Sequence, residues 1–302
     1  MMSYIVVIGS ANIDISLNID NDIIWRDSNI GLITLSPGGV GRNIAENLGR
    51  INLNTHFITP LGHEMDAKLL KDSCTENGVV LHPISNDTIT TSKYAALFDK
   101  DNDMLVGVAD TLCVEALQPK EFKPYRSLIE KAALLVLETN LSESTLKYLS
   151  TLNKRVFINA ISTSKAPKIK SIYPLIDTLS LNRLEAKTLT NFDITETSIE
   201  KTRDFFIDLG VQTVIITLGS EGAYVLTKEK IIKKAALKTN VESTSGAGDG
   251  FFAGYIYGLM KGKDPLNTAN ALASITLQSK STVNPTLDES KLKTKLKESK
   301  HA

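Results

Sequence analysis

Short runs of consecutive apolar residues recur along the chain and constrain its fold more than any other feature of the sequence. The first, "YIVVIG", spans residues 4–9, and similar runs follow at 56–59, 134–138, 155–159, 177–182 and 213–219. Such runs are typical of strands that are buried on both faces. Segments with helical spacing lie between them, among them 64–78 and 198–210. The alternation predicts an α/β fold with a mostly parallel sheet flanked by helices.

Two regions break this rhythm and predict a second, smaller β layer. In "ANIDISLNI", apolar and polar residues alternate, so that Asn12 and Asp14 share one face of a strand. Residues 92–110 fit two strands around the polar turn "DKDND". We expect a small β-strand lid built from 12–35 and 92–111, with the remainder as the core of a single domain over 1–302.

The balance of charge gives no sign of a polyanionic partner. Lysine and arginine together number 34, as do aspartate and glutamate, so neither nucleic acid nor an anionic membrane is expected as a partner. No window of 18 consecutive apolar residues predicts a membrane span, and the N-terminus lacks the pattern of a secretory signal. The two cysteines have no metal-site spacing. We expect a cytoplasmic protein.

The segment "ESTSGAGDGFFAG", residues 242–254, carries the clearest chemical signal. Phe252, Ile256 and Leu259 then recur at helical spacing, which places Gly246, Ala247 and Gly248 at a helix N-terminus, where free N–H groups favour an anion. Asp249 falls in the first turn. It is either a helix-end charge or, beside a bound phosphate, a base that takes a proton from an attacking hydroxyl.

Two common nucleotide-binding patterns do not account for this segment. Residues 248–253 match G-x-G-x-x-A formally, but they lie near the C-terminus and no strand with a ribose-binding acid follows. The pattern G-x-x-x-x-G-K-[ST] does not occur in the sequence. A dehydrogenase and a conventional P-loop enzyme are therefore disfavoured.

Three further groups of residues suit ligand binding, and each also has a plain structural interpretation. Asn182 and Glu185 suit Mg²⁺ through water, or form a helix cap. Thr217 and Gly219 follow a buried strand, where α/β sheets bind ligands, or form an ordinary turn. The polar face of the alternating strand and the turn "GGVGRN" suit sugar hydroxyls, or are merely exposed polar groups. The residues of that last group are Asn12, Asp14, Gly39 and Asn43.

Taken together, the motifs resemble those of the PfkB family of carbohydrate kinases, which have a ribokinase-like three-layer fold. The order N-x-D, GG-x-G-x-N, N-x-x-E, T-x-G-x-x-G and GAGD runs along essentially the whole chain. The resemblance implies that Asp249 is the catalytic base beside an anion hole at Gly246, Ala247 and Gly248. It also implies Mg²⁺ held near Asn182 and Glu185, ATP contacted by Thr217 and Gly219, and acceptor ligands at Asn12, Asp14, Gly39 and Asn43.

Within the family, the run "RNIAEN" from Arg42 to Asn47 is most similar to pseudouridine kinases, which phosphorylate the 5′-hydroxyl of that nucleoside. A sugar kinase of the ribokinase or fructokinase type, and an inactive sugar- or nucleotide-binding regulator, are the alternatives.

Ser243 stands where the family often has an aspartate of a monovalent-cation site, so potassium activation is not expected. Thr111, Asn140 and Lys165 are candidates for residues near the nucleobase of the acceptor. An exposed β layer would suit a homodimer through the lid.

Overall fold

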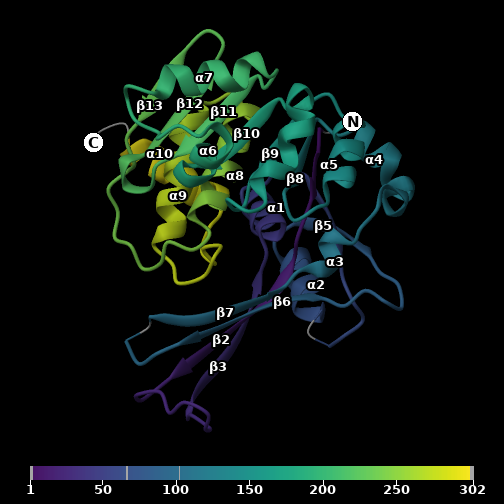
Figure 1. The fold of residues 1–302 in the computed structure, drawn as a ribbon, viewed down its shortest axis with the longest axis vertical. Coiled ribbons are helices and arrows are strands. Elements are labelled where there is room, and N and C mark those ends of the chain that lie inside the picture. The colour runs from purple at the N-terminus through teal and green to yellow at the C-terminus, as the bar shows by residue number, and fades with distance from the viewer. Residues whose placement is uncertain (1–2, 66, 102, 300–302) are drawn as a thin grey trace.

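The computed structural model describes residues 3–65, 67–101 and 103–299. Asp66 of the expected helix 64–78, Asn102 of the expected turn and residues 300–302 of the expected C-terminal tail lie outside these ranges. The described chain forms two sheets, with helices on both faces of the larger one and the smaller one extending beyond it (Figure 1).

Within the described residues, the main sheet has nine strands in the order β13-β12-β11-β10-β9-β8-β1-β4-β5. From β11 to β5 in this order, every pair of adjacent strands is parallel, whereas β12 and β13 are antiparallel additions at the other edge. The bounds are β1 (Ile5–Ile8), β4 (Thr55–Pro60), β5 (Val79–Ile84), β8 (Leu134–Glu138), β9 (Val156–Asn159), β10 (Thr178–Asn182), β11 (Thr213–Thr217), β12 (Ala223–Thr227) and β13 (Ile231–Lys234).

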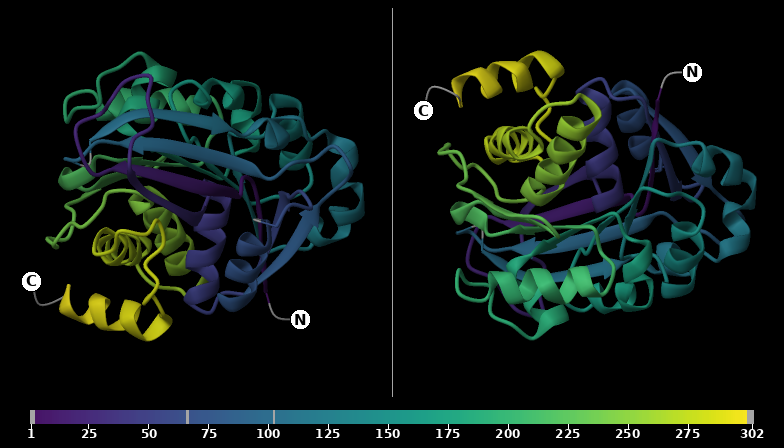
Figure 2. Two further views of the ribbon diagram at one scale, coloured as in Figure 1. Left: turned by 90° about the horizontal axis from the view of Figure 1, so that it is seen from below. Right: turned by 90° about the horizontal axis from the view of Figure 1, so that it is seen from above.

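Successive side chains of these strands pack into two separate cores because they point to opposite faces of the sheet. In β1, Ile5 and Val7 join one core while Val6 and Ile8 join the other. The first core is covered by α1 (Val40–Arg50), α2 (Ala67–Glu76), α8 (Ala247–Met260), α9 (Pro265–Leu277) and α10 (Glu289–Glu298). Figure 2 shows this layer, purple and yellow, on the opposite side of the sheet from the green layer.

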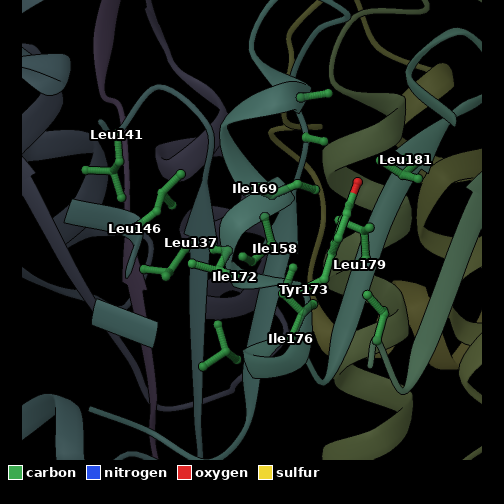
Figure 3. Packing of buried hydrophobic residues seen from close by; sticks show 14 of the residues in the cluster. Leu137, Leu141, Leu146, Ile158, Ile169, Ile172, Tyr173, Ile176, Leu179 and Leu181 are labelled. Atoms are coloured by element: carbon green, nitrogen blue, oxygen red, sulfur yellow. The ribbon is translucent and has the colours of Figure 1, made fainter. Parts of the chain in front are cut away.

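The second core lies beneath shorter helices. Its members include Leu137, Ile158 and Leu179 of the sheet, which meet Ile172 and Tyr173 from the covering layer (Figure 3). The covering elements are α3 (Leu112–Glu115), α4 (Arg126–Glu130), α5 (Glu143–Ser150), α6 (Arg183–Thr190), α7 (Ile199–Asp208) and the 3₁₀ helices η1 (Pro119–Tyr125) and η2 (Ala166–Leu175). None of the helices in the described ranges is both long and apolar enough to cross a membrane.

The smaller sheet has the order β3-β2-β6-β7 and joins sequence segments that are far apart. It consists of β2 (Asn12–Ile19), β3 (Gly31–Gly38), β6 (Ser92–Phe98) and β7 (Met104–Asp110). The predicted hairpin is confirmed, since β6 and β7 pair antiparallel. The sheet extends to Gly38, beyond the expected boundary at residue 35.

β3 and β5 are among the strands that the sequence did not predict. β3 is largely exposed and shows no clean alternation of buried and exposed residues, and its place is fixed by backbone pairing with β2. β5 contains Pro83, which argues against a central strand. The structure places β5 at the edge of the main sheet, where a proline costs no ladder hydrogen bond on the open side.

Candidate active site

The carboxyl ends of the parallel strands bring the candidate residues together at one edge of the main sheet. Asn182 ends β10 and is paired in register with Thr217, which ends β11. Glu138 ends β8 and is paired with Asn159 at the end of β9. This is the edge at which parallel α/β sheets bind their ligands.

Asp249 lies buried in the first turn of α8, with 8% of its surface exposed. The amide nitrogen Nδ2 of Asn43, in the first turn of α1, donates a hydrogen bond of 2.8 Å to its Oδ2. Burial raises the pKa of Asp249 to about 7, while the Asn43 hydrogen bond and the charge of Arg42 oppose that rise. A carboxyl group with a pKa near neutrality is suited to accept a proton.

The start of α8 requires glycine at one position and leaves space at another. Gly246 is the N-cap with φ of 75°, and a Cβ there would overlap the carbonyl oxygen of Thr282. A Cβ on Gly248 would meet no atom within 4 Å. Since the first N–H groups of a helix lack intrahelical acceptors, this open space is a natural place for an anion.

Asp249 and Gly248 line a small cavity of about 140 Å³ together with Asn182, Glu185 and Thr217. Three motifs that are widely separated in the sequence therefore meet in one space. The cavity is completed by Val40, Asn159, Ile161, Ser180 and Leu181.

Asn182 and Glu185 cap α6 and face this cavity at the same time. The Asn182 Oδ1 accepts from the Glu185 backbone N–H at 2.9 Å, and the Glu185 Oε2 accepts from the Asn182 N–H at 2.8 Å. Burial raises the pKa of Glu185 to about 7, against the opposing hydrogen bond from Asn182. The two residues thus do form a helix cap. Glu185 is nevertheless buried, whereas the glutamate of a simple surface cap would be exposed.

A larger cavity of about 450 Å³ adjoins the small one, because Thr217 and Gly248 line both. Gly219 has φ of 62° with no atom within 4 Å of an added Cβ, so the turn after β11 is open to a ligand. The walls are mostly apolar and suit a flat, aromatic group. They include Leu237, Val241, Phe251, Ala273 and Leu277.

The N-terminal candidates are connected to Asp249 through the Asn43 hydrogen bond. Asn12 donates a hydrogen bond from Nδ2 to Oδ1 of Asp14, which confirms that the two share a face. Burial raises the pKa of Asp14 to about 6, opposed by Arg42 and Asn12. Gly39 has φ of 99°, and a Cβ there would lie 2.8 Å from the Asn12 Oδ1. Asp14 also lines a cavity of about 690 Å³ beneath the smaller sheet, with Tyr94 and Phe98.

Two buried charged residues at this edge were not assigned a role from the sequence. Glu138 is fully buried, and its Oε1 accepts from the Ser10 backbone N–H at 2.8 Å. Burial raises its pKa to about 7, and the neighbouring Asp249 raises it further. Glu138 also accepts a hydrogen bond from Asn140, and Asn140 in turn accepts one from Lys165. Asn140 and Lys165, two of the three candidates for the neighbourhood of the nucleobase, are therefore in contact. The only sequence signal for Glu138 is its place at the end of the apolar run "LLVLE".

Arg42 is the second such residue, and it is 3% exposed. The sequence marked it only as part of a run typical of one subfamily. Thr111, the remaining candidate, is the N-cap of α3 just after β7. Ser243 is half-buried, and its Oγ accepts from the Ser245 N–H at 3.2 Å within the loop before α8.

The chain is similar to known proteins over nearly its whole length. The profile of the pfkB family carbohydrate kinases matches residues 2–289. The pseudouridine kinase of Escherichia coli K12 is 30% identical over 94% of this chain and 93% of its own. A carbohydrate kinase from Agrobacterium tumefaciens has a TM-score of 0.86 at 26% identity, covering 98% of this chain and 97% of its own. Arabidopsis thaliana ribokinase, in complex with ribose and ATP, has a TM-score of 0.90 at 23% identity, with coverages of 98% and 99%.

Proposed function

Because the chain belongs to the pfkB family of carbohydrate kinases, we propose that it transfers the γ-phosphoryl group of ATP to the 5′-hydroxyl of a nucleoside, with pseudouridine as the acceptor. The observation that carries this proposal is the position of Asp249. It lines the small cavity that adjoins one suited to a nucleotide, it accepts a hydrogen bond from Asn43, and it stands at the start of a helix that suits a phosphate.

Asp249 acts as the base in this proposal. The 5′-oxygen of the acceptor forms a bond to the γ-phosphorus, the bond from that phosphorus to the β,γ-bridging oxygen of ATP breaks, and the hydroxyl proton passes to the Asp249 carboxylate. ADP leaves with the electron pair of the broken bond. Most of the rate enhancement in such reactions comes from positioning and charge stabilisation, which the first turn of α8 at Gly246, Ala247 and Gly248 supplies.

The nucleotide occupies the 450 Å³ cavity, with Thr217 and Gly219 at the turn after β11 and the apolar wall against the adenine. Its phosphates extend past Gly248 towards Asp249. Asn182 and Glu185, which line the small cavity, would hold Mg²⁺ through water, because amide and carboxylate oxygens suit this ion. The ion neutralises charge on the phosphates when it is bound.

The acceptor is held by Asn12, Asp14, Gly39 and Asn43. Paired donors and acceptors of this kind suit vicinal hydroxyls, which both donate and accept. The preference for pseudouridine rests on the similarity to the bacterial pseudouridine kinase. A free sugar is the second candidate, since a sugar kinase from the same bacterium is 32% identical over 94% of this chain.

A screen of ATP consumption with five acceptors tests the proposal: pseudouridine, uridine, ribose, fructose and adenosine. We expect the highest kcat/KM with pseudouridine and loss of turnover with EDTA. The variant Asp249→Asn, purified in the same way, controls for contaminating kinases. A higher kcat/KM with ribose or fructose would assign the chain to the sugar kinases, and ATP turnover with none of the five would remove the nucleoside proposal.

The outer face of the smaller sheet is apolar, and we propose that two copies pair through it. Leu35, Ile15, Ala95 and Val108 follow one another across the four strands; Leu35 and Val108 on the outer strands are more than half exposed, whereas Ile15 packs partly against the core. The neighbouring row of Ser36, Asp14 and Tyr94 lines the 690 Å³ cavity on the opposite face. One face therefore serves the site, and the other is a wide apolar surface of the kind that marks interfaces.

A further inference from the structure

All the N–H donors of the Arg42 guanidinium group form hydrogen bonds within the protein. Its Nε donates to the Gly38 carbonyl at 3.1 Å, and Nη1 donates to Glu46 and, at 3.5 Å, to Ser73. Its Nη2 donates to the Oδ1 of Asn43 and, at 3.1 Å, to Thr282. Since an arginine has five N–H donors, none is left for a ligand, although Arg42 borders the 690 Å³ cavity.

These contacts fix which way the Asn43 amide points. The Oδ1 of Asn43 accepts from Arg42 and also from the Thr282 hydroxyl at 3.1 Å. With its oxygen held on that side, the amide must present its Nδ2 to Asp249, at 2.8 Å from Oδ2. The reversed amide would place its oxygen against the carboxylate and its nitrogen against the guanidinium, which would put like partners together on both sides.

We propose that Arg42 is a positioning residue for the proposed phosphoryl transfer: it locks the Asn43 amide towards Asp249 and keeps that carboxylate in its ionised, proton-accepting form. This inference rests on the proposed role of Asp249 as the base. It assigns a purpose to an arginine that contacts neither the acceptor nor the nucleotide directly.

The charges around Asp249 give this positive group its importance. Glu138 at the end of β8 is close enough for its charge and that of Asp249 to disfavour each other, and Glu185 of α6 lines the same small cavity. Asp14 of β2 lies within the field of Arg42 as well. Arg42 and the Asn43 hydrogen bond are the influences that lower the pKa of Asp249 against its burial. Glu46, which pairs with Arg42, is also held by Arg50 at 2.8 Å and so stays partnered if Arg42 is replaced.

The test compares three single variants by the pH dependence of kcat/KM with ATP and pseudouridine. Arg42→Gln should move the acidic limb of the profile upward by about one pH unit, the usual effect of losing a nearby opposite charge, with much of kcat recovered at high pH. Arg42→Lys keeps a positive charge and should move the limb less. Arg50→Gln is the matched control: it removes the other arginine partner of Glu46, one turn along α1, and should leave the limb in place.

A second measurement does not depend on the acceptor. In the ligand-free protein, ¹³C NMR of the carboxyl groups, assigned by difference with Asp249→Asn, should show a higher pKa for Asp249 in Arg42→Gln than in the wild type. The double variant Arg42→Gln/Glu46→Gln removes the buried ion pair, leaves Arg50 with the Pro285 carbonyl as its partner, and should show the same shift if the single variant folds poorly. An unchanged pKa of Asp249 in a folded variant would overturn the positioning role, whereas a wild type that phosphorylates no acceptor while the NMR shift holds would count against the proposed function alone.

Discussion

The side-chain carboxyl group of Asp249 lies where burial favours its neutral, protonated form. Its surroundings supply one hydrogen-bond donor, from Asn43, and one nearby positive charge, from Arg42, and its pKa is still raised to about 7. The acid is thus balanced between its two protonation states at neutral pH. That balance suits a group that must accept a proton during the reaction and release it afterwards.

Replacing Asp249 by asparagine should separate chemistry from binding. We expect Asp249→Asn to lower kcat by about 10²–10⁴-fold, the usual effect of losing a general base, and to leave the KM for ATP within several-fold. The amide has nearly the same shape, and the nucleotide cavity is lined by other residues. Steady-state kinetics at saturating acceptor checks this expectation. Near-normal turnover would show that Asp249 is only a helix-end charge.

Local motifs identified the candidate residues, whereas long-range contacts were hidden. The pairs Asn12 with Asp14 and Asn182 with Glu185 are two and three residues apart, so periodicity alone places them together. The Ser10–Glu138 and Arg42–Thr282 contacts span 128 and 240 residues, and no spacing rule could reveal them. The role proposed for Arg42 depends on contacts with five partners, and these contacts are visible only in the folded chain.

At the level of single elements, the start of α8 offers a comparison between two glycines of the same turn. Gly246→Ala should destabilise the protein by roughly 1–3 kcal/mol, because the residue needs a positive φ and its Cβ would overlap the carbonyl of Thr282. Gly248→Ala should fold normally, since the added methyl group meets no atom, yet it fills the space proposed for the phosphate.

Thermal unfolding and kinetics together check this pair. The melting temperature should fall for Gly246→Ala and stay close to the wild-type value for Gly248→Ala. The kcat/KM for ATP should fall for Gly248→Ala despite its intact fold. If Gly248→Ala had full activity, the proposal that the phosphate lies against this turn would be wrong.

The strands that sequence patterns identified were those of the buried centre. β1, β8 and β11 each contain three or more consecutive apolar residues and stand out as short runs. β3 and β5 are edge strands, where solvent or a proline disturbs the pattern, and their positions follow from backbone pairing with β2 and β4. Side-chain pattern alone therefore fails to predict edge strands such as these.

Considered as a whole, the molecule gathers four acids whose pKa values are raised by burial: Asp14 to about 6, and Glu138, Glu185 and Asp249 to about 7. In the unfolded chain these groups titrate near pH 4. Between about pH 4 and about 7 the native state therefore binds more protons than the unfolded state. Their joint contribution to stability is present below pH 4 and is lost as the pH rises to about 7.

This linkage predicts how one variant differs from the wild type in the absence of ligands. The free energy of unfolding of Asp249→Asn should match the wild-type value near pH 4 and exceed it by an increasing amount up to about pH 7, because the amide never ionises. Urea unfolding at a series of pH values gives this difference directly. A constant difference across the range would mean that Asp249 is not the buried, titrating group described above.

The apolar face of the smaller sheet makes a prediction about assembly. Sedimentation velocity should show a dimer at micromolar concentration, and Val108→Glu should shift it to the monomer while the far-ultraviolet circular dichroism stays unchanged. Val108 is 64% exposed in the single chain, so a charge there has no cost in the folded monomer. A wild type that sediments as a monomer across this range would rule out the pairing.

Only residues 9–11 separate β1, inside the main sheet, from β2, which carries Asn12 and Asp14 on the smaller sheet. These two proposed acceptor ligands thus stand outside the core, whereas Asn43 of α1, the proposed nucleotide cavity and Asp249 belong to it. The part of the proposed acceptor site on the smaller sheet can accordingly change during evolution without a change in the core. A chimera that takes its smaller sheet from a ribokinase should acquire much of that enzyme's acceptor specificity and keep this chain's own KM for ATP.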